Sequence, residues 1–489
     1  MRWLLLGLGS VTLVGGGVGG VLYFGGDGPA AEEASNERAA DDLAALAAEL
    51  PEATAPAEAT EETGDEDAPA LRLRRPALPG AWSEPETPER TALIARAYQF
   101  NAPVYERPAR RPEIQGVVRR GRAIPIEGRA YGEGCRNGRW YRTTLGVVCT
   151  SDGFEVDANP EERDQKPADF TGPMPYRYAA VGRRDGALRF FRIPNVEELA
   201  SAEGAASAGG DEEPSFPEVV QQAMVGDFFV ALDRVEQDGW QRTVRGHYVA
   251  TDELEELETP PMVGSHLDEE TTLPLAFVYG EDRPLYRVEE DGVREVGVAE
   301  KHARFSVRET LERDGVTYLV GEGGLAVRRD AVRLARETAP EERIPSDVRW
   351  VHVDLAEQTL VAYDGGEPVF ATLVSSGKEG YDTPRGVFRI REKYVSITMS
   401  GDDPVDGAYE VEEVPWTMYY WKSYALHGAY WHGDFGNVRS HGCTNLAPAD
   451  ARWLFEWTSP DVPAGWHGRR LRRGTWVWFS RGDAGYDAS

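Results

Sequence analysis

The sequence predicts a mainly β protein, in which several small β-barrel modules precede a larger C-terminal β domain. Its apolar stretches are short and mostly alternate with polar residues, which is typical of half-buried strands rather than of long helices. Gly and Pro are abundant and divide these stretches into pieces of strand length. A chain of 489 residues is also too long for one hydrophobic core, so two to four domains are expected.

The charge of the chain restricts its partners. A formal net charge of -30 at pH 7 excludes the basic surface that binds a phosphate backbone, so nucleic acid is not an expected partner. No cofactor is expected, and no cluster with the spacing of a metal site stands out.

The first 90 residues predict an export segment and a tether. Residues 1–26 contain an uncharged run, residues 3–24, that is long enough to span a bilayer, and a less favoured reading is a signal peptide cleaved near Ala30. We expect membrane contact through this run, with the rest of the chain in the cell envelope on the periplasmic side; cleavage would release it into the periplasm. Residues 27–90 are an acidic Ala/Glu/Pro mixture that predicts a disordered linker.

Three stretches of short strands and turns follow the linker. Residues 91–160 alternate Gly-punctuated apolar strands with a Gly-Arg-Trp-Tyr strand, and this unit resembles a bacterial SH3-like domain. Parts of the pattern return in residues 170–260 and 270–340, which predicts a second and a third module. The Gly/Ala/Ser/acidic segment 200–214 is expected to be a loop inserted in the second module.

The three cysteines predict two different roles. Cys135 and Cys149 flank the Trp-Tyr strand of the first module, and a close pair in an exported chain usually forms a disulfide. Two free buried thiols are the alternative. Cys443 then has no partner, and an unpaired thiol in an oxidising compartment must be buried or used.

The C-terminal domain, residues 346–481, contains the groups that a nucleophilic thiol needs. An Asp-Gly-Gly sequence at 364–366 predicts a hairpin near its start. His427 lies sixteen positions before Cys443, and His441 lies two positions before it, which puts the latter pair on one face of an extended segment. A thiol of this kind requires a base and oxyanion donors. Both imidazoles, the backbone N–H groups of Gly442 and Cys443, and Asn445 are the candidates.

These residues carry a family resemblance. Ser440-His441-Gly442-Cys443 with Asn445, preceded by Ser376-Gly377-Lys378 and by Thr383-Pro384-Arg385-Gly386-Val387-Phe388, resembles the signatures of an L,D-transpeptidase catalytic domain of the YkuD type. The resemblance covers residues 348–480 and implies a β-sandwich fold. It also implies that Cys443 is the nucleophile, His427 the proton acceptor and donor, and the Gly428 carbonyl the group that orients the imidazole. His441 would assist at the thiolate and the oxyanion, with Ser440, Gly442 and Asn445 around the reacting carbonyl.

Several neighbours keep alternative roles. His432 is expected to be a hydrogen-bonded loop residue, with substrate contact as the second possibility. Tyr430 and Trp431 fit core packing and a peptide-binding cleft equally well. A zinc peptidase using His427, His432, Asp434 and His441 is disfavoured, because the spacing matches no helical HExxH site and leaves Cys443 unexplained.

The resemblance also implies a substrate. L,D-transpeptidases attack the tetrapeptide stem of peptidoglycan, release D-Ala and hold the stem as a thioester. The acceptor is then the amine of a second stem, which gives a 3→3 cross-link. Alternatively it is water, which would make the enzyme an L,D-carboxypeptidase, or an outer-membrane protein amine. A non-catalytic scaffold that binds the wall is the remaining alternative.

Overall fold

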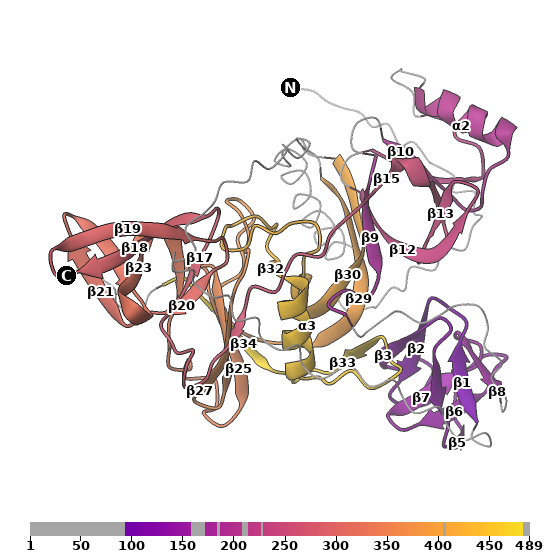
Figure 1. Ribbon diagram of the computed structural model, residues 1–489. Coiled ribbons are helices and arrows are strands. Elements are labelled where there is room, and N and C mark those ends of the chain that lie inside the picture. Colours follow the sequence, from indigo (N-terminus) through magenta and orange to yellow (C-terminus); the bar gives the residue numbers. More distant parts are fainter. Residues whose placement is uncertain are drawn as a thin grey trace, which may run out of the picture.

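The computed structural model describes residues 93–157, 172–182, 186–207, 214–225, 228–403 and 407–482. Within these ranges the protein is mainly β, as predicted, with strands from the third module at one end, the C-terminal domain in the middle and the first two modules at the other end (Figure 1). The predicted export segment and linker, residues 1–26 and 27–90, lie outside the described ranges. No helix inside these ranges is long and apolar enough to cross a bilayer.

The first module is a small closed unit around a core that includes Val104, Val118 and Phe154. Strand β1 pairs with β4 and β8, β2 pairs with β3 and β7, and β5, β6 and β7 form a meander. The strands are β1 (Ile94–Ala97), β2 (Asn101–Tyr105), β3 (Ile114–Arg119), β4 (Ala123–Pro125), β5 (Gly128–Ala130), β6 (Trp140–Thr143), β7 (Gly146–Cys149) and β8 (Phe154–Asp157).

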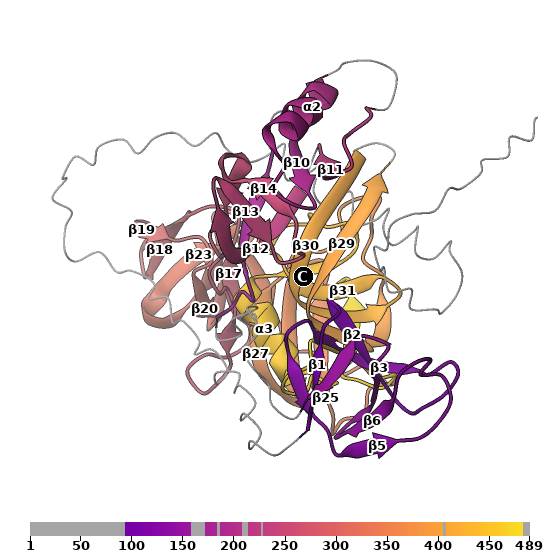
Figure 2. The same ribbon diagram turned by 90° about the vertical axis from the view of Figure 1, so that its right-hand side faces the viewer.

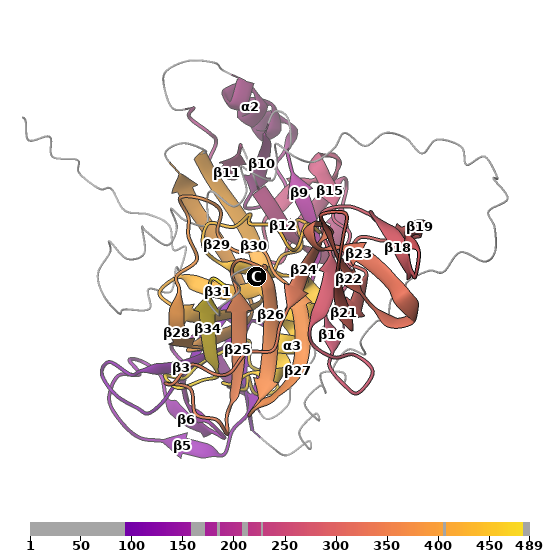
Figure 3. The same ribbon diagram turned by 90° about the vertical axis from the view of Figure 1, so that its left-hand side faces the viewer.

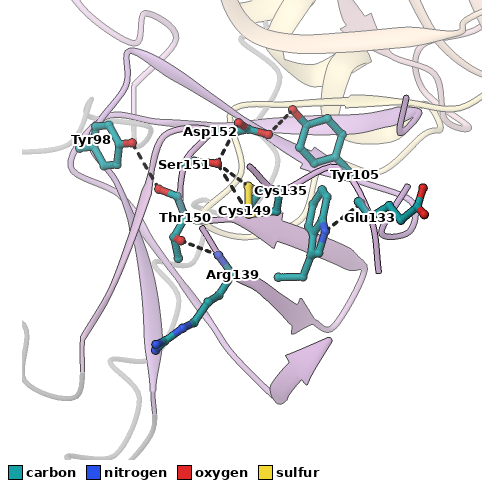
Figure 4. The surroundings of a disulfide bond; sticks show 10 residues. Tyr98, Tyr105, Glu133, Cys135, Arg139, Cys149, Thr150, Ser151 and Asp152 are labelled. Carbon is teal, nitrogen blue, oxygen red and sulfur yellow. Dashed lines mark hydrogen bonds between the residues drawn. A yellow bond between two sulfur atoms is a disulfide. The ribbon is translucent and has the colours of Figure 1, made fainter. Parts of the chain in front are cut away.

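Cys135 and Cys149, the predicted pair, form a disulfide in this module. The hydroxyl of Ser151 lies 3.0 Å from the Cys149 sulfur, and the ring of Tyr105 meets that of Trp140 edge to face at 5.5 Å (Figure 4). The disulfide therefore joins the end of β7 to the loop that precedes β6.

The second module contains a helix where the sequence predicted a loop. Its elements are β9 (Arg177–Val181), β10 (Ala187–Phe190), α2 (Val196–Ser207), β11 (Val220–Met224), β12 (Phe228–Gln237), β13 (Trp240–Thr243), β14 (Tyr248–Ala250), the short helix η1 (Thr251–Glu253) and β15 (Leu254–Glu256). The loop prediction for 200–214 is wrong up to Ser207, because Ala and Glu favour helix. A reciprocal cap starts α2: Asn195 Oδ1 accepts the Glu198 N–H at 2.9 Å, and Glu198 Oε2 accepts the Asn195 N–H at 2.9 Å.

The third module has a three-stranded sheet, β20-β17-β24, and a five-stranded sheet, β19-β18-β23-β22-β21, that share one core. Its elements are β17 (Leu275–Val278), β18 (Arg283–Glu289), β19 (Gly292–Ala299), β20 (Arg304–Ser306), β21 (Glu309–Arg313), β22 (Val316–Val320), η2 (Glu322–Gly324), β23 (Leu325–Arg328), η3 (Arg329–Ala331) and β24 (Val332–Ala335). Strand β16 (Ser265–His266) precedes the module and pairs with the C-terminal domain. That the three modules are SH3-like stays a prediction.

The C-terminal domain consists of two sheets and one helix. Its elements are β25 (Arg349–Asp354), β26 (Thr359–Asp364), β27 (Glu367–Leu373), β28 (Gly386–Arg389), β29 (Glu392–Asp403), β30 (Gly407–Trp421), β31 (Tyr424–Gly428), β32 (Thr444–Leu446), α3 (Pro448–Trp457), β33 (Gly468–Arg470) and β34 (Trp476–Ser480). One sheet has the order β16-β27-β26-β25-β34-β28, and Figure 3 shows β25, β26 and β27 from the front. The other contains β33, β29, β30, β31 and β32.

The core of this domain lies between the two sheets and against α3, with Val351, Phe370, Met418 and Leu454 among its fully buried members. The predicted Asp-Gly-Gly hairpin is confirmed, because β26 pairs with β27 and Asp364 stands opposite Glu367. The turn needs a left-handed residue, and Gly365 has φ of 61°.

The first two modules join the sheet that carries β29 and β30. Strand β3 pairs with β33 through Gly116 opposite Arg469, and β12 pairs in parallel with β30 through Phe228 opposite Glu410. Figure 2 shows β30 and β29 rising beside β10, β11 and β14 of the second module. The modules are therefore continuous with the C-terminal domain rather than separate from it.

Candidate active site

The thiol loop and its base lie on neighbouring parallel strands. Strands β31 and β32 pair with His427 opposite Asn445 and Leu426 opposite Thr444. Cys443 comes immediately before β32, two residues before Asn445. Alternate residues of an extended segment share a face, so Cys443 lies on the face that carries the His427 ring.

Cys443 is half-buried and is the cysteine of the described residues that forms no disulfide. Its sulfur lies 3.8 Å from the Ser423 carbonyl oxygen. Burial, and then the charge of the Cys443 thiolate, raise the pKa of the Tyr419 and Tyr420 hydroxyls. The contact with Ser423 places the sulfur at the turn between β30 and β31.

His427 is an uncharged base at neutral pH. Its ring is 1% exposed, and burial lowers its pKa to about 4, against a smaller opposing effect of the Gly428 carbonyl. Nδ1 lies 3.4 Å from that carbonyl oxygen. A proton on Nδ1 leaves Nε2 as the acceptor, which is the tautomer that a thiol's general base requires.

Gly442 allows the loop to pass under an aromatic ring. It has φ of 115°, and a Cβ at this position would lie 2.4 Å from the Tyr424 Cε1 atom. Both the backbone conformation and the space exclude a side chain here. Sequence reasoning missed Tyr424, whose role has no local signal besides the neighbouring aromatic residues.

Ser440 holds the thiol loop internally and is fully buried. Its Oγ accepts the Gly442 N–H at 3.0 Å and donates to the Cys443 carbonyl oxygen. That Ser440 and the Gly442 N–H face the reacting carbonyl stays a prediction. Ser440 shapes the turn, and the Gly442 N–H is already engaged.

The second sequence signature supports the same loop. Thr383 Oγ1 accepts the Gly377 N–H at 2.9 Å and donates to the Gly442 carbonyl oxygen at 2.9 Å. The Lys378 N–H donates to the Ser440 carbonyl oxygen at 2.7 Å. The two motifs, far apart in sequence, thus form one hydrogen-bonded unit around the thiol.

His441 packs against this second segment. Its ring meets the Tyr381 ring edge to face at 4.1 Å, and burial lowers the pKa of His441 to about 3. The imidazole is therefore neutral under physiological conditions. Tyr381 was missed by sequence reasoning, although it lies inside the quoted signature between Lys378 and Thr383.

His432 and Asn445 bind each other. His432 Nδ1 accepts the Asp434 N–H at 3.2 Å, and its Nε2 lies 3.0 Å from the Asn445 side-chain amide. The predicted loop role of His432 fits this geometry, whereas the predicted substrate role of Asn445 does not. Both ring nitrogens of His432 are used, which argues against the zinc reading.

Tyr430 and Trp431 are buried rather than set along an open cleft. Tyr430 is 1% exposed and donates from Oη to the Glu412 carbonyl oxygen at 2.9 Å. Trp431 is 6% exposed, and its ring centroid lies 5.8 Å from that of His427. Of their two predicted readings, core packing therefore fits and substrate lining does not.

Part of this chain matches the model of one protein family, and the chain is similar to a curated protein and to several solved structures. Residues 348–478 match the model of the YkuD family, the L,D-transpeptidase catalytic domain. The putative L,D-transpeptidase YciB of Bacillus subtilis is 25% identical over 181 residues, which are 32% of this chain and 82% of that protein.

Two solved structures of the Enterococcus faecium L,D-transpeptidase are also similar. Its catalytic domain is 26% identical over 27% of this chain and 98% of that one, with a TM-score of 0.23. A longer crystal structure of a mutant of the same enzyme is 25% identical, with a TM-score of 0.23, over 30% of this chain. This chain spans only 55% of that longer structure.

Proposed function

Because residues 348–478 are a YkuD-type L,D-transpeptidase catalytic domain, we propose that the protein is a cysteine acyltransferase acting on peptidoglycan stem peptides. The observation that supports this most directly is Cys443, a half-buried thiol outside the disulfide, immediately before the strand that pairs with the strand of the neutral, buried His427. A thiol next to an uncharged imidazole can lose its proton to it as it attacks a carbonyl.

The reaction proceeds in two halves. The Cys443 sulfur attacks the carbonyl carbon of the third stem residue while its proton passes to His427 Nε2. The C–N bond to D-Ala then breaks, and His427 returns the proton to the leaving amine, which leaves a thioester. An acceptor amine attacks the thioester carbonyl, gives its proton to His427, and the Cys443 thiol is restored. The Gly428 carbonyl keeps the imidazole proton on Nδ1 through this cycle.

The negative charge on the carbonyl oxygen requires donors close by. With the Gly442 N–H bound to Ser440, the proposed donors are the Cys443 N–H and the His441 ring. A neutral His441 offers a donor without adding a positive charge that would disfavour protonation of His427. Tyr381 fixes the plane of the His441 ring for this role.

The proposed acceptor is the amine of a second stem, which places the protein in the cell envelope, outside the cytoplasmic membrane. Incubation with purified tetrapeptide stems followed by mass spectrometry tests this. Dimeric 3→3 products are expected. Free tripeptide would indicate hydrolysis, and stems attached to an outer-membrane protein would indicate an attachment enzyme.

The Cys443→Ser variant is the control, with product formation expected to fall at least a thousandfold. Acylation by a carbapenem, a mimic of the stem that the family generally accepts, gives an independent measurement on the intact protein. If the wild-type thiol is not acylated and no stem is converted, the domain is a wall-binding scaffold and the proposal is wrong. Chelator-sensitive activity that survives Cys443→Ala would restore the zinc alternative.

A further inference from the structure

A stack of aromatic rings runs from the second module to the catalytic histidine. Tyr178, on β9, stacks on Tyr430 with centroids 3.9 Å apart and planes at 26°. Tyr430 meets Trp431 edge to face at 5.0 Å, and Trp431 lies over His427 at 5.8 Å with planes at 34°. Tyr178 of the second module is therefore linked to the ring of the proposed base through two side chains, Tyr430 and Trp431.

Hydrogen bonds fix this stack on the C-terminal domain. Tyr178 Oη donates to the Glu413 carbonyl oxygen at 2.7 Å, and Tyr430 Oη donates to that of Glu412 at 2.9 Å. The two phenols are thus held on consecutive residues of β30. Phe229, on β12 of the second module, contacts both Tyr430 and Trp431, with centroids 6.2 and 6.3 Å away.

The His427 ring needs such support. The hydrogen bond that orients it, Nδ1 to the Gly428 carbonyl oxygen, is long at 3.4 Å. A bond of this length fixes a ring weakly. General-base catalysis depends on placing the acceptor nitrogen within hydrogen-bond reach of the thiol, and small displacements cost much of the rate. The neighbouring Trp431 ring, tilted by 34° with its centroid 5.8 Å away, therefore helps to hold the imidazole in place.

We propose that Tyr178 is a positioning residue for His427, so that the second module completes the active site. The proposal rests on the role of His427 as the base of Cys443. Tyr178 touches neither the thiol nor a substrate in this arrangement. It acts by holding Tyr430, and through it Trp431, against the imidazole.

The reactivity of Cys443 reports this positioning without any substrate. The chain has three cysteines, and Cys135 and Cys149 are joined, so iodoacetamide labels Cys443 alone in the intact protein. The alkylation rate is measured by mass spectrometry across pH 5 to 10. His427, His441, Tyr419, Tyr420 and Tyr424 are titratable groups near the thiol loop, and all five are unchanged in the variants of Tyr178.

We expect Tyr178→Ala to slow alkylation at pH 7 by about tenfold, toward the rate of His427→Ala, because a displaced imidazole no longer takes the thiol proton as the sulfur attacks. Tyr178→Leu, which keeps an apolar side chain in the site, should do the same if Tyr178→Ala does not fold. Tyr178→Phe keeps the stacked ring and should stay within about twofold of the wild type.

Phe190→Ala is the matched control. Phe190 is a buried aromatic of the same module, 1% exposed, but it packs on Trp240 at 5.3 Å and not on the stack. The inference is overturned if Tyr178→Leu keeps the wild-type profile, or if Phe190→Ala changes the profile equally. A wild-type profile for His427→Ala would instead contradict the base assigned in the proposed function, which separates the two failures.

Discussion

Gly442 is a position of the thiol loop with no space for even one additional carbon atom. Replacing it with Ala puts a Cβ 2.4 Å from the Tyr424 ring and strains a backbone with φ of 115°. We expect Gly442→Ala to lower the acylation rate of Cys443 by about a hundredfold, because the loop must shift the thiol to relieve the clash. The rate of carbapenem acylation, followed by intact-protein mass spectrometry, measures this.

Gly433 provides the matched control six residues after His427. A Cβ there meets nothing within 4 Å, and the residue has no left-handed φ. Gly433→Ala should therefore keep the acylation rate within about twofold and the unfolding temperature unchanged. Equal losses in the two variants would show that the loop tolerates no change at all, and would contradict the specific role assigned to Gly442.

For single residues, the sequence predicted which residues belong to the site better than it predicted what each of them does there. Cys443 and His427 could be singled out because a thiol and an imidazole in that order fit one kind of chemistry. The roles of Ser440 and Gly442 could not be assigned, because they depend on which hydrogen bond closes the turn. Tyr178 gave no signal, since its partner Tyr430 lies about 250 positions away in the chain.

The β29–β30 hairpin is the element on which the modules converge. Arg189, on β10 of the second module, pairs with Glu410 at 2.6 Å and with Glu412 at 2.9 Å, and its side chain is only 3% exposed. Arg119, on β3 of the first module, forms a buried ion pair with Glu413. The acidic face of β30 is thus neutralised by arginines from two upstream modules.

Removing one buried partner leaves an uncompensated charge. Burial raises the pKa of Glu412 to about 7, and the Arg189 guanidinium opposes that rise. We expect Arg189→Ala to destabilise the protein by about 3–5 kcal/mol, because Glu412 must then be buried as an unpaired charge or become protonated. Thermal unfolding of the full chain at pH 8, where the carboxylate would otherwise be ionised, measures the loss.

Arg192→Ala is the control for that loss. Arg192 pairs with Glu198 at 2.6 Å, but its side chain is 60% exposed. Exposed pairs contribute at most about 1 kcal/mol, so a small change in unfolding temperature is expected. Similar effects of the two substitutions would show that burial does not determine the strength of these pairs.

For the whole molecule, the sequence predicted a series of β units but not how they join. Alternation and turn residues are local and gave the mainly β class and the Asp-Gly-Gly hairpin. Pairing between β12 and β30 links residues more than 180 positions apart, and it depends on the three-dimensional course of the chain. The third module likewise contacts the His432 loop, where Lys301 lies 3.7 Å from Asp434 and Arg333 donates to the Gly436 carbonyl oxygen at 2.8 Å.

Buried imidazoles give the molecule a shared response to acid. Burial is the main cause that lowers the pKa of seven histidines below the ordinary value. In four of them the pKa falls to about 4. The seven are His247, His302, His352 and His427, all near 4, His441 near 3, and His432 and His467 well below their usual range. Below pH 6.5 the unfolded chain binds protons at these positions, while the folded chain binds them only near pH 4. Stability is therefore lost as the pH falls from about 6.5 toward 4.

Four carboxyl groups oppose this trend. Burial raises the pKa of Asp450 to about 6 and that of Glu412 to about 7, and it also raises the pKa of Asp354 and Glu456, so their folded forms bind protons before the unfolded chain does. That contribution favours the folded state as the pH falls below 7. Seven histidines against four carboxyl groups make the net effect destabilising in acid.

We therefore expect the unfolding temperature of the full chain to be clearly lower at pH 5.5 than at pH 7, measured by calorimetry at constant ionic strength. A fully buried histidine with a folded pKa near 4 contributes about 1.4 kcal/mol to this difference. His352, whose Nε2 lies 2.8 Å from the Ser480 hydroxyl, is remote from the thiol loop and can be replaced without touching the site. In His352→Gln the loss of unfolding free energy between pH 7 and pH 5.5 should be smaller by that amount. An unfolding temperature that stays constant or rises at pH 5.5 would show that these imidazoles become charged without cost, and would contradict their burial in the folded protein.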